Sequence, residues 1–168
     1  MLVHEIMSTD LVKAKKTDTV WSAVMKMIDR DCGAIPIVEG NNQLIGMVTV
    51  RDVLLPLYPK HGDSIIPDVT IVFNIFPRAD AQSQNFVEME AQYPEALGKQ
   101  VEGIMSSHPM TVAPDDPILK AALYMGVKNL RRAPVVDKGR LVGIVSISDI
   151  NRGLFFKEGG WEMSSAFG

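Results

Sequence analysis

Two aspartates stand at matching places along the chain, each three residues after a hydroxyl side chain. Asp52 follows Thr49, and Asp149 follows Ser146. A carboxylate at this spacing can accept hydrogen bonds from hydroxyl groups of a ligand, and the side-chain hydroxyl can form a further bond. An aspartate that opens a helix can instead cap that helix. The residues alone leave both interpretations open.

Other residues that could support catalysis are scattered. His4, His61 and His108 have no serine or cysteine placed beside them by a motif, so no nucleophile, base and orienting group can be assembled. Cys32 is the single cysteine, and it falls at a predicted helix C-terminus, where the helix dipole disfavours a reactive thiolate. No Cys/His grouping has zinc spacing, and there is no glycine-rich phosphate loop. The sequence therefore predicts no catalytic residue, no metal site and no enzyme.

Length and composition narrow the class of protein. The 168 residues suffice for one domain or two small halves that share a core, and 46% hydrophobic with 22% charged residues is typical of a globular chain. A formal net charge of −3 provides no basic surface for nucleic acid or an anionic membrane. Neither a signal peptide nor an apolar run long enough to span a membrane is visible. We expect a cytoplasmic protein.

Three segments recur in the same order, so the chain contains two copies of one unit. Residues 6–8 recur at 104–106, residues 36–39 at 134–137, and residues 44–52 at 141–149. The offset changes from 98 to 97 residues because one residue is lost in the turn between Glu39 and Gln43. Both aspartates end the third segment, so the two hydroxyl–aspartate pairs are equivalent.

Each copy is expected to contain a helix, two strands and a short second helix after a short extended segment. Thr17 or Asp18 is the expected cap of the first helix, and Asp116 caps its equivalent with Pro117 in the first turn. Apolar stripes at helical spacing are Val20, Val24, Met27 and Ile28, and Ile118, Ala121, Ala122 and Met125. Runs rich in β-branched residues predict strands at 34–38, 44–50, 133–136 and 141–147. The second helix should begin at the aspartate that ends each copy.

One such unit of about 50 residues buries too little surface to be stable alone. Two copies packed through their sheets with pseudo-twofold symmetry could share a core. Equivalent clefts would then lie between the strand ends of one copy and the segment leading into the other.

The Gly-x-Val-Thr/Ser-x-x-Asp ending of each copy, preceded by a Pro-Val-Val-Asp-type strand, resembles the cystathionine-β-synthase (CBS) domain. Two in tandem resemble a CBS pair, or Bateman module, over about residues 3–57 and 100–156. The resemblance implies an α/β fold of two β-α-β-β-α repeats. The expected division is repeat 1 at 1–57, an insert with a helix at 58–99, repeat 2 at 100–156 and a tail at 157–168.

The resemblance also implies a function. CBS pairs bind adenosine-containing ligands in their clefts as regulatory sensors, so we expect AMP, ADP or ATP, with S-adenosylmethionine as a further possibility. No cofactor is required. The sensed state would pass to an unidentified protein partner, in a standalone homodimer concerned with energy sensing.

By the same resemblance, each cleft combines residues of both repeats. The first cleft is expected to contain Thr49, Asp52, Arg131, Arg132, Ala133 and Val112, and the second Ser146, Ser148, Asp149, Val12, Gly33 and Ala34. Each aspartate would accept from the ribose hydroxyls and the arginines would bind phosphate oxygens, while the second cleft lacks arginines and would hold a less charged ligand or none.

Backbone amides of Val112 and Val12 would read the purine edge, and Ile35 and Ala133 would form apolar walls. The alternatives remain that the arginines are solvated charges at a helix end and that the apolar residues are core.

Several segments favour other interpretations. The connection at 54–100 contains apolar runs at 65–67 and 69–76 and a predicted helix at 79–93, and the C-terminal tail is aromatic. Candidates for a helical dimer face are Met25, Met27, Tyr124 and Met125, with core packing as the alternative. A second hypothesis is an interaction protein with vestigial clefts that acts through its dimer surface, insert and tail. Slow turnover of a bound nucleotide is a third and weaker hypothesis.

Overall fold

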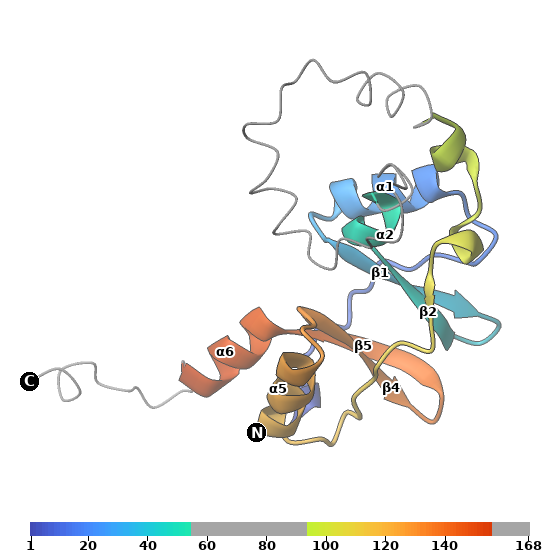
Figure 1. Cartoon of the computed structure of the whole chain (residues 1–168). Helices are drawn as coiled ribbons and strands as arrows, with labels where there is room; N and C mark the ends of the chain where they lie inside the picture. The colour runs from blue at the N-terminus through green and yellow to red at the C-terminus, as the bar shows by residue number, and fades with distance from the viewer. Residues whose placement is uncertain (55–93, 156–168) are drawn as a thin grey trace, which may run out of the picture. The chain divides into compact units, whose positions relative to one another are not determined.

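The computed structural model describes residues 1–54 and 94–155 (Figure 1). The predicted helix at 79–93, the apolar runs at 65–67 and 69–76, and the tail at 157–168 lie outside the described residues.

The predicted order of helix, strand, strand and helix is confirmed in both repeats. The elements are η1 (Val3–Glu5), α1 (Val20–Asp29), β1 (Ala34–Glu39), β2 (Gln43–Thr49), α2 (Val50–Leu54), η3 (Val101–Gly103), β3 (Ser106–Ser107), α5 (Ile118–Val127), β4 (Arg132–Asp137), β5 (Arg140–Ser146) and α6 (Ile147–Phe155). The four predicted strands match β1, β2, β4 and β5 to within one residue at each end. The molecule is therefore of the predicted α/β class.

The predicted cap of the first helix is wrong. Thr19 is the N-cap residue, and its hydroxyl oxygen accepts the Ser22 N–H at 3.1 Å. Asp18 instead accepts the N–H of Lys15 at 3.2 Å. The Asp18 side chain bonds to the preceding loop, so the hydroxyl of the next residue, Thr19, caps the helix instead.

The second repeat shows the same difference. Pro117 occupies the N-cap position of α5, and the Asp116 carboxylate accepts the N–H of Ala113 at 2.9 Å. Asp18 and Asp116 are separated by the repeat offset, so both repeats use this aspartate to stabilise the loop before the helix rather than the helix itself.

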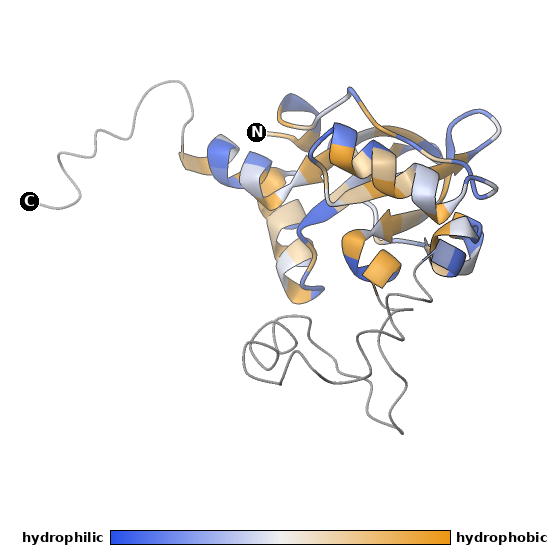
Figure 2. Cartoon of the chain, turned by 90° about the horizontal axis from the view of Figure 1, so that it is seen from above, coloured by the Kyte–Doolittle hydropathy of each residue, from blue (hydrophilic) through white to orange (hydrophobic). Residues whose placement is uncertain are grey.

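Hydrophobic and hydrophilic residues alternate along the helices in Figure 2, and the buried positions of α1 and α5 agree with most of the predicted stripes. The buried positions are Val20, Ala23 and Met27 in α1, and Ile118, Ala121 and Met125 in α5. Ile28 is 67% exposed, which corrects its assignment to the core. It lies eight residues after Val20, so at 3.6 residues per turn it is rotated by about 80° from that position.

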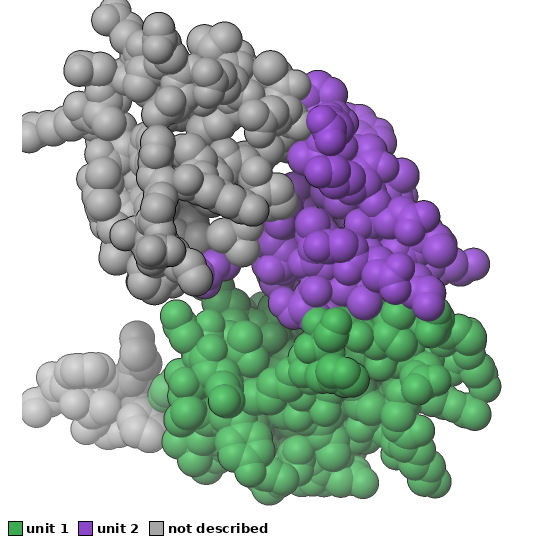
Figure 3. All heavy atoms as spheres, turned by 45° about the vertical axis from the view of Figure 1, so that its right-hand side comes forward, with its two compact units in different colours: residues 1–13, 36–46, 107–168 green, residues 14–35, 47–106 purple. Residues whose placement is uncertain are grey.

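The chain forms two compact units that do not follow the repeat boundaries (Figure 3). Unit 1 contains Met1–Lys13, Pro36–Gly46 and the described chain from Ser107 onward. Unit 2 contains Ala14–Ile35 and the described chain between Met47 and Ser106. We call residues 1–8 and 101–106 the leading segments, and each belongs to the unit that holds the first helix of the other repeat.

In unit 1 the leading segment of repeat 1 docks on repeat 2. The N–H of Val3 donates to the carbonyl of Asp116 at 2.9 Å, and the N–H of His4 donates to the carbonyl of Pro114 at 2.9 Å. Ser8 and Ile144 exchange two backbone hydrogen bonds of 2.9 and 3.0 Å. The core around this segment contains Val3, Val112, Ala121, Met125, Ala133, Val135, Val145 and Ile150.

Unit 2 repeats this docking with the roles reversed. The N–H of Val101 donates to the carbonyl of Asp18 at 2.9 Å, and the N–H of Glu102 donates to that of Lys16 at 3.2 Å. The two repeats have therefore exchanged their leading segments.

One sheet runs in the order β1-β2-β5-β4, and β3 pairs with β2. Within unit 1, β2 meets β5 in antiparallel pairing at Gln43 and Arg140. The N–H of Leu141 donates to the carbonyl of Asn42 at 2.9 Å, and Asn42 has a left-handed φ of 64°. Asn42 lies in the turn that is one residue longer in repeat 1. This turn therefore contributes to the contact between β2 and β5.

Candidate functional site

The first hydroxyl–aspartate pair closes the start of α2. The Thr49 backbone N–H and hydroxyl both donate to Oδ2 of Asp52, each at 2.7 Å. The N–H of Asp52 donates back to the Thr49 hydroxyl oxygen at 3.3 Å. Thr49 is therefore the N-cap, and Asp52, the third residue of the helix, completes a reciprocal capping box.

The second pair has the same geometry at the start of α6. The Ser146 N–H and hydroxyl donate to Oδ2 of Asp149 at 2.9 and 2.6 Å, and the N–H of Asp149 donates to the Ser146 oxygen at 3.1 Å. Both second helices thus begin two residues before the aspartate, which corrects the predicted start. A hydroxyl in front of the helix is the better cap because its oxygen reaches the orphan N–H of the first turn.

Capping and ligand binding are compatible at these aspartates. Within residues 1–54 and 94–155, all the hydrogen bonds to both carboxylates converge on Oδ2, and none involves Oδ1. All four side chains of the two pairs are half-buried, so they are neither sealed in the core nor fully solvated. Each box holds a carboxylate in a fixed rotamer with one acceptor oxygen uncommitted.

The hydroxyls are more restricted than the sequence indicates. A carboxylate can only accept, so the hydroxyl protons of Thr49 and Ser146 are used in the bonds to their aspartates. In this arrangement neither hydroxyl can donate to a phosphate, although its oxygen can still accept. Ser148 is exposed on the first turn of α6 and remains a candidate donor.

The two arginines lie beside the second pair in unit 1. Arg132, which is half-buried, is the register partner of Ser146 across β4 and β5. The carbonyl of Arg131, an exposed residue, accepts the N–H of Ile147 at 3.0 Å. Thr49 and Asp52 belong to unit 2, so their predicted grouping with these arginines stays a prediction.

The helix-dipole explanation of the arginines does not hold. α5 ends at Val127, with Lys128 as its C-cap, and Arg131 lies three residues further on. The dipole effect falls off within the last turn of a helix.

Several predicted apolar contacts are core residues of their own units. Val112 and Ala133 belong to the core of unit 1. The Val112 N–H donates to Pro134 at 3.1 Å and its carbonyl accepts from Val136 at 2.9 Å, so that amide is not available to read a purine edge. Ile35 is also fully buried.

The predicted second-cleft residues differ in accessibility. Ala34 is buried, whereas Val12 and Gly33 are half-buried. The Gly33 carbonyl accepts the N–H of Val50 at 3.1 Å, just as that of Arg131 accepts from Ile147.

The first helix of each repeat, α1 or α5, carries exposed apolar side chains, of which the sequence predicted only some. These are Trp21, Met25 and Ile28 on α1, and Leu119, Leu123, Tyr124 and Val127 on α5. Met25 and Tyr124 are exposed as a dimer face requires, but Met27 and Met125 are buried and cannot contribute to one. The i, i+4, i+8 spacing of Leu119, Leu123 and Val127 was the signal in the sequence that could have identified this face.

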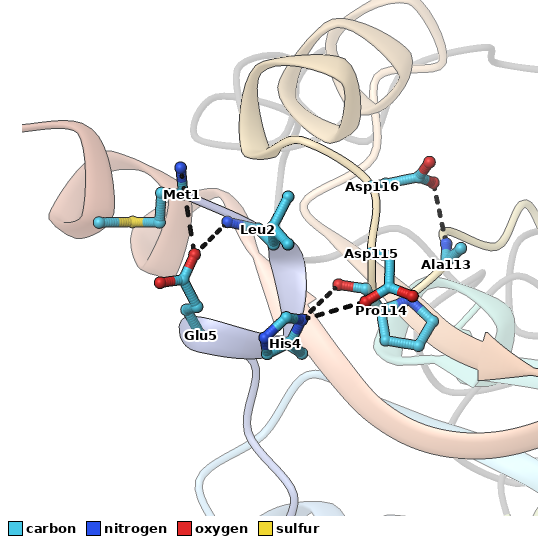
Figure 4. Close-up of polar contacts among 8 residues, drawn as sticks. All are labelled: Met1, Leu2, His4, Glu5, Ala113, Pro114, Asp115 and Asp116. Atoms are coloured by element: carbon cyan, nitrogen blue, oxygen red, sulfur yellow. Dashed lines mark hydrogen bonds and ion pairs between the residues drawn. The ribbon is translucent and has the colours of Figure 1, made fainter.

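The docked leading segment carries a polar network (Figure 4). His4 Nδ1 lies 3.1 Å from the Pro114 carbonyl oxygen and 3.5 Å from Asp115 Oδ1, and Glu5 accepts the backbone N–H of Leu2. These contacts are exposed and hold no convergent nucleophile. The described residues contain no cluster of metal-ligating side chains, and no helix among them is long and apolar enough to cross a membrane.

Neighbouring groups stabilise the charged form of Asp18 and Asp116, the aspartates in the loops before α1 and α5. The Lys120 ammonium, 2.6 Å from the Asp116 carboxylate, and the Ala113 N–H lower the pKa of Asp116. Lys26, at 2.8 Å, and the Lys15 N–H lower the pKa of Asp18 in the same way. These bonds stabilise the two loops on which the leading segments dock.

The fold and the paired boxes define a tandem-repeat module with one candidate ligand carboxylate in each repeat. A family model described as the CBS domain matches residues 3–57 and 101–155. The chain therefore belongs to the CBS-domain family and contains a tandem CBS pair.

Relatives of different length share this similarity. The chloroplastic CBS domain-containing protein CBSX2 of Arabidopsis thaliana is 29% identical over 139 residues, which cover 82% of this chain but only 56% of that protein. A CBS domain-containing protein of Dictyostelium discoideum is 25% identical over 155 residues, covering 89% of this chain and 88% of its own length.

Solved structures show the same fold. The crystal structure of CBSX2 from Arabidopsis thaliana matches with a TM-score of 0.67 at 24% identity, covering 91% of this chain and 93% of that one. The CBS domain pair of protein MJ0100, in complex with 5′-methylthioadenosine and S-adenosyl-L-methionine, matches with a TM-score of 0.64 at 23% identity, covering 94% and 98%. CBSX2 in complex with AMP matches with a TM-score of 0.64 at 23% identity, covering 91% and 95%.

Proposed function

We propose that this protein is a regulatory module that binds adenosine-containing ligands through Asp52 and Asp149. The observation that carries the proposal is the uncommitted Oδ1 of each aspartate, held at equivalent places by equivalent capping boxes. The complexes of related CBS pairs with AMP, S-adenosylmethionine and methylthioadenosine support this class of ligand.

The chemistry suits a ribose. Its two neighbouring hydroxyls are donors, and a carboxylate oxygen with free lone pairs can accept from them. Because Oδ2 is already fixed by two donors, little side-chain entropy is lost when a ligand binds to Oδ1, which favours affinity.

Regulation requires that the ligand favour one conformation over another. A ligand shifts such an equilibrium only by its difference in affinity for the two states. Ligand binding at the boxes would be transmitted to a protein partner through α2, α6 or the exposed faces of α1 and α5, and the same faces could form a homodimer.

Thermal unfolding with AMP, ADP, ATP and S-adenosylmethionine tests the proposal. A ligand at 100 times its Kd should stabilise the wild type by roughly 2.7 kcal/mol. Asp52→Asn and Asp149→Asn should each reduce the shift, because an amide replaces one acceptor oxygen by a donor. Asp137→Asn, at an exposed aspartate on β4, is the matched control and should leave the shift unchanged.

A flat response of the wild type to all four ligands would refute adenosine sensing. The exposed helix faces would then favour the second candidate, an interaction protein with vestigial clefts.

A further inference from the structure

The two leading segments dock through the same backbone hydrogen bonds. Val3 and Val101 are fully buried, and each N–H donates at 2.9 Å to the carbonyl of the equivalent loop aspartate, Asp116 or Asp18. The next residue of each segment donates to the carbonyl two positions before that aspartate. Both segments contain the sequence Val-x-x-Ile-Met-Ser. Their buried valine and their backbone hydrogen bonds are therefore equivalent and do not distinguish one segment from the other.

The loops that receive the segments differ in charge. We call residues 113–116 the docking loop of repeat 2 and residues 15–18 the docking loop of repeat 1, and their sequences are Ala-Pro-Asp-Asp and Lys-Lys-Thr-Asp. The last aspartate of each loop is paired with a lysine of the following helix, Lys120 at 2.6 Å or Lys26 at 2.8 Å. The difference that remains is Asp115 in the first loop against two lysines in the second. The docking loop of repeat 2 is therefore acidic and that of repeat 1 is basic.

Each leading segment carries a side chain that suits the loop on which it docks. His4 Nδ1 lies 3.1 Å from the Pro114 carbonyl oxygen and 3.5 Å from Asp115 Oδ1 (Figure 4). Because a carbonyl and a carboxylate oxygen only accept, this contact requires a proton on Nδ1. The equivalent residue, Glu102, docks on the basic loop, where its N–H donates to the Lys16 carbonyl at 3.2 Å. The imidazole therefore lies on the acidic loop and the glutamate on the basic one.

The alternative arrangement is that each segment docks on its own repeat. Glu102 would then lie beside Asp115, with a like charge at short range and no proton for the Pro114 carbonyl. His4 on the basic loop would lose its carboxylate neighbour but could still donate to the Lys16 carbonyl. Exposed charges contribute little to stability, but selection requires only a difference in free energy between the two pairings. The acidic loop should therefore be the more selective of the two.

We propose that Asp115 in one docking loop, and Lys15 and Lys16 in the other, direct the exchange of leading segments between the repeats. The docking loop of repeat 2 accepts the segment that carries His4, and the docking loop of repeat 1 accepts the segment that carries Glu102. The occupant of each loop is thus a segment of this chain that is selected by its charge. The selection acts without a ligand, so it goes beyond the proposed function and does not depend on it.

Amide hydrogen exchange of the full, ligand-free chain tests this proposal, because the N–H groups of Val3 and Val101 report the docking of the two segments separately. His4→Glu should lower the protection of Val3 about two- to tenfold and leave that of Val101 unchanged. His4→Gln keeps a donor and should lower it less. Salt at about 1 M should reduce the loss in His4→Glu, because the charges are exposed. Asn41→Glu adds a negative charge at an exposed position of unit 1 and is the matched control, which should leave both amides unchanged.

The docking loop of repeat 2 can also be tested by reversing its charge. Asp115→Lys in the His4→Glu background should restore the protection of Val3, because opposite charges then face each other again. Equal losses in His4→Glu and His4→Gln, or a loss that neither salt nor Asp115→Lys reverses, would assign the effect to packing and overturn the proposal. Unchanged protection of Val3 in His4→Glu would overturn it as well.

The selectivity should be transferable to the docking loop of repeat 1. Thr17→Asp places a carboxylate at the position equivalent to Asp115, so it should lower the protection of Val101. Glu102→His in this background should restore that protection, because an imidazole then faces the new carboxylate. Unchanged protection of Val101 in Thr17→Asp would show that a charge at this position does not select the segment, and the proposal would be wrong.

Discussion

Asp149 has a structural role that can be separated from ligand binding. It accepts the Ser146 N–H and hydroxyl, so Asp149→Ala should lower the free energy of unfolding by about 1 kcal/mol without any ligand. Asp149→Asn retains an acceptor and should cost less, while still impairing ribose binding. Urea denaturation of the ligand-free variants measures both effects, and an Ala variant as stable as the wild type would show that the box contributes nothing to folding.

Gly143 is required by the close approach of the leading segment to β5. A Cβ at this position would lie 2.9 Å from Cγ of Met7 and 3.2 Å from the carbonyl oxygen of Ser8, and it would also clash with the Met7 sulfur. Gly143→Ala should therefore destabilise the protein by about 1–3 kcal/mol. Gly126→Ala is the matched control, because an exposed helical glycine with nothing within 4 Å should gain about 0.5–1 kcal/mol. Thermal or urea unfolding compares the two, and equal effects would contradict the close-approach argument.

The stability that Asp116 gives to the loop before α5 should depend on pH. The folded-state pKa of Asp116 lies below its ordinary value of 3.8, so its stabilising effect is present above that pH and is lost as the pH falls through the folded value. Asp116→Asn should lower the free energy of unfolding at pH 7, and this loss should become progressively smaller below about pH 4. Urea unfolding across pH 3–7 measures the difference, and a cost independent of pH would assign the effect to geometry rather than charge.

The exposed face of α5 permits a prediction about assembly. Leu123 and Val127 are 68% and 82% exposed one helical turn apart, an arrangement more typical of a covered surface than of a solvated helix. If this face joins two copies, Leu123→Arg should convert a dimer into a monomer without loss of helical content. Sedimentation velocity with circular dichroism measures both, and Lys128→Arg, just past the helix, is the control. A wild type that is monomeric at high concentration would remove this face from consideration as a dimer surface.

The turn that contains Asn42 is one residue longer than its equivalent in repeat 2, and variants at Asn42 test what this turn contributes to the stability of the whole molecule. The Asn42 side-chain oxygen accepts from Lys13 Nζ at 3.0 Å, and its backbone has a left-handed φ of 64°. Its side-chain amide also donates to the Leu141 carbonyl at 3.5 Å. Asn42→Ala loses both bonds and strains the backbone, so it should cost about 1–2 kcal/mol, whereas Asn42→Gly loses only the bonds and should cost less. Equal unfolding free energies for the two variants would show that alanine adopts the left-handed backbone conformation at position 42 without loss of stability.

Much of the molecule could be predicted from the sequence because the same pattern of residues occurs in both repeats. Strand positions followed from β-branched runs, and Thr49, Asp52, Ser146 and Asp149 were paired correctly as hydroxyl and carboxylate. The helix starts were missed because Asp18 and Asp116 bond to the preceding loop, a competition that spacing alone does not resolve. The register that sets Arg132 opposite Ser146 depends on tertiary strand pairing and could not be read from either repeat alone.

The exchange of leading segments has a consequence for the order in which the protein is made. His4 leaves the ribosome before its partner Pro114, which follows 110 residues later. The leading segment of repeat 1 must therefore wait, with Val3 and its neighbours uncovered, until most of repeat 2 has been translated. The leading segment of repeat 2 meets Lys16 and Asp18, which are already synthesised, as soon as it emerges. The leading segment of repeat 2 can thus dock as soon as it is made, whereas the leading segment of repeat 1 is built into the fold later.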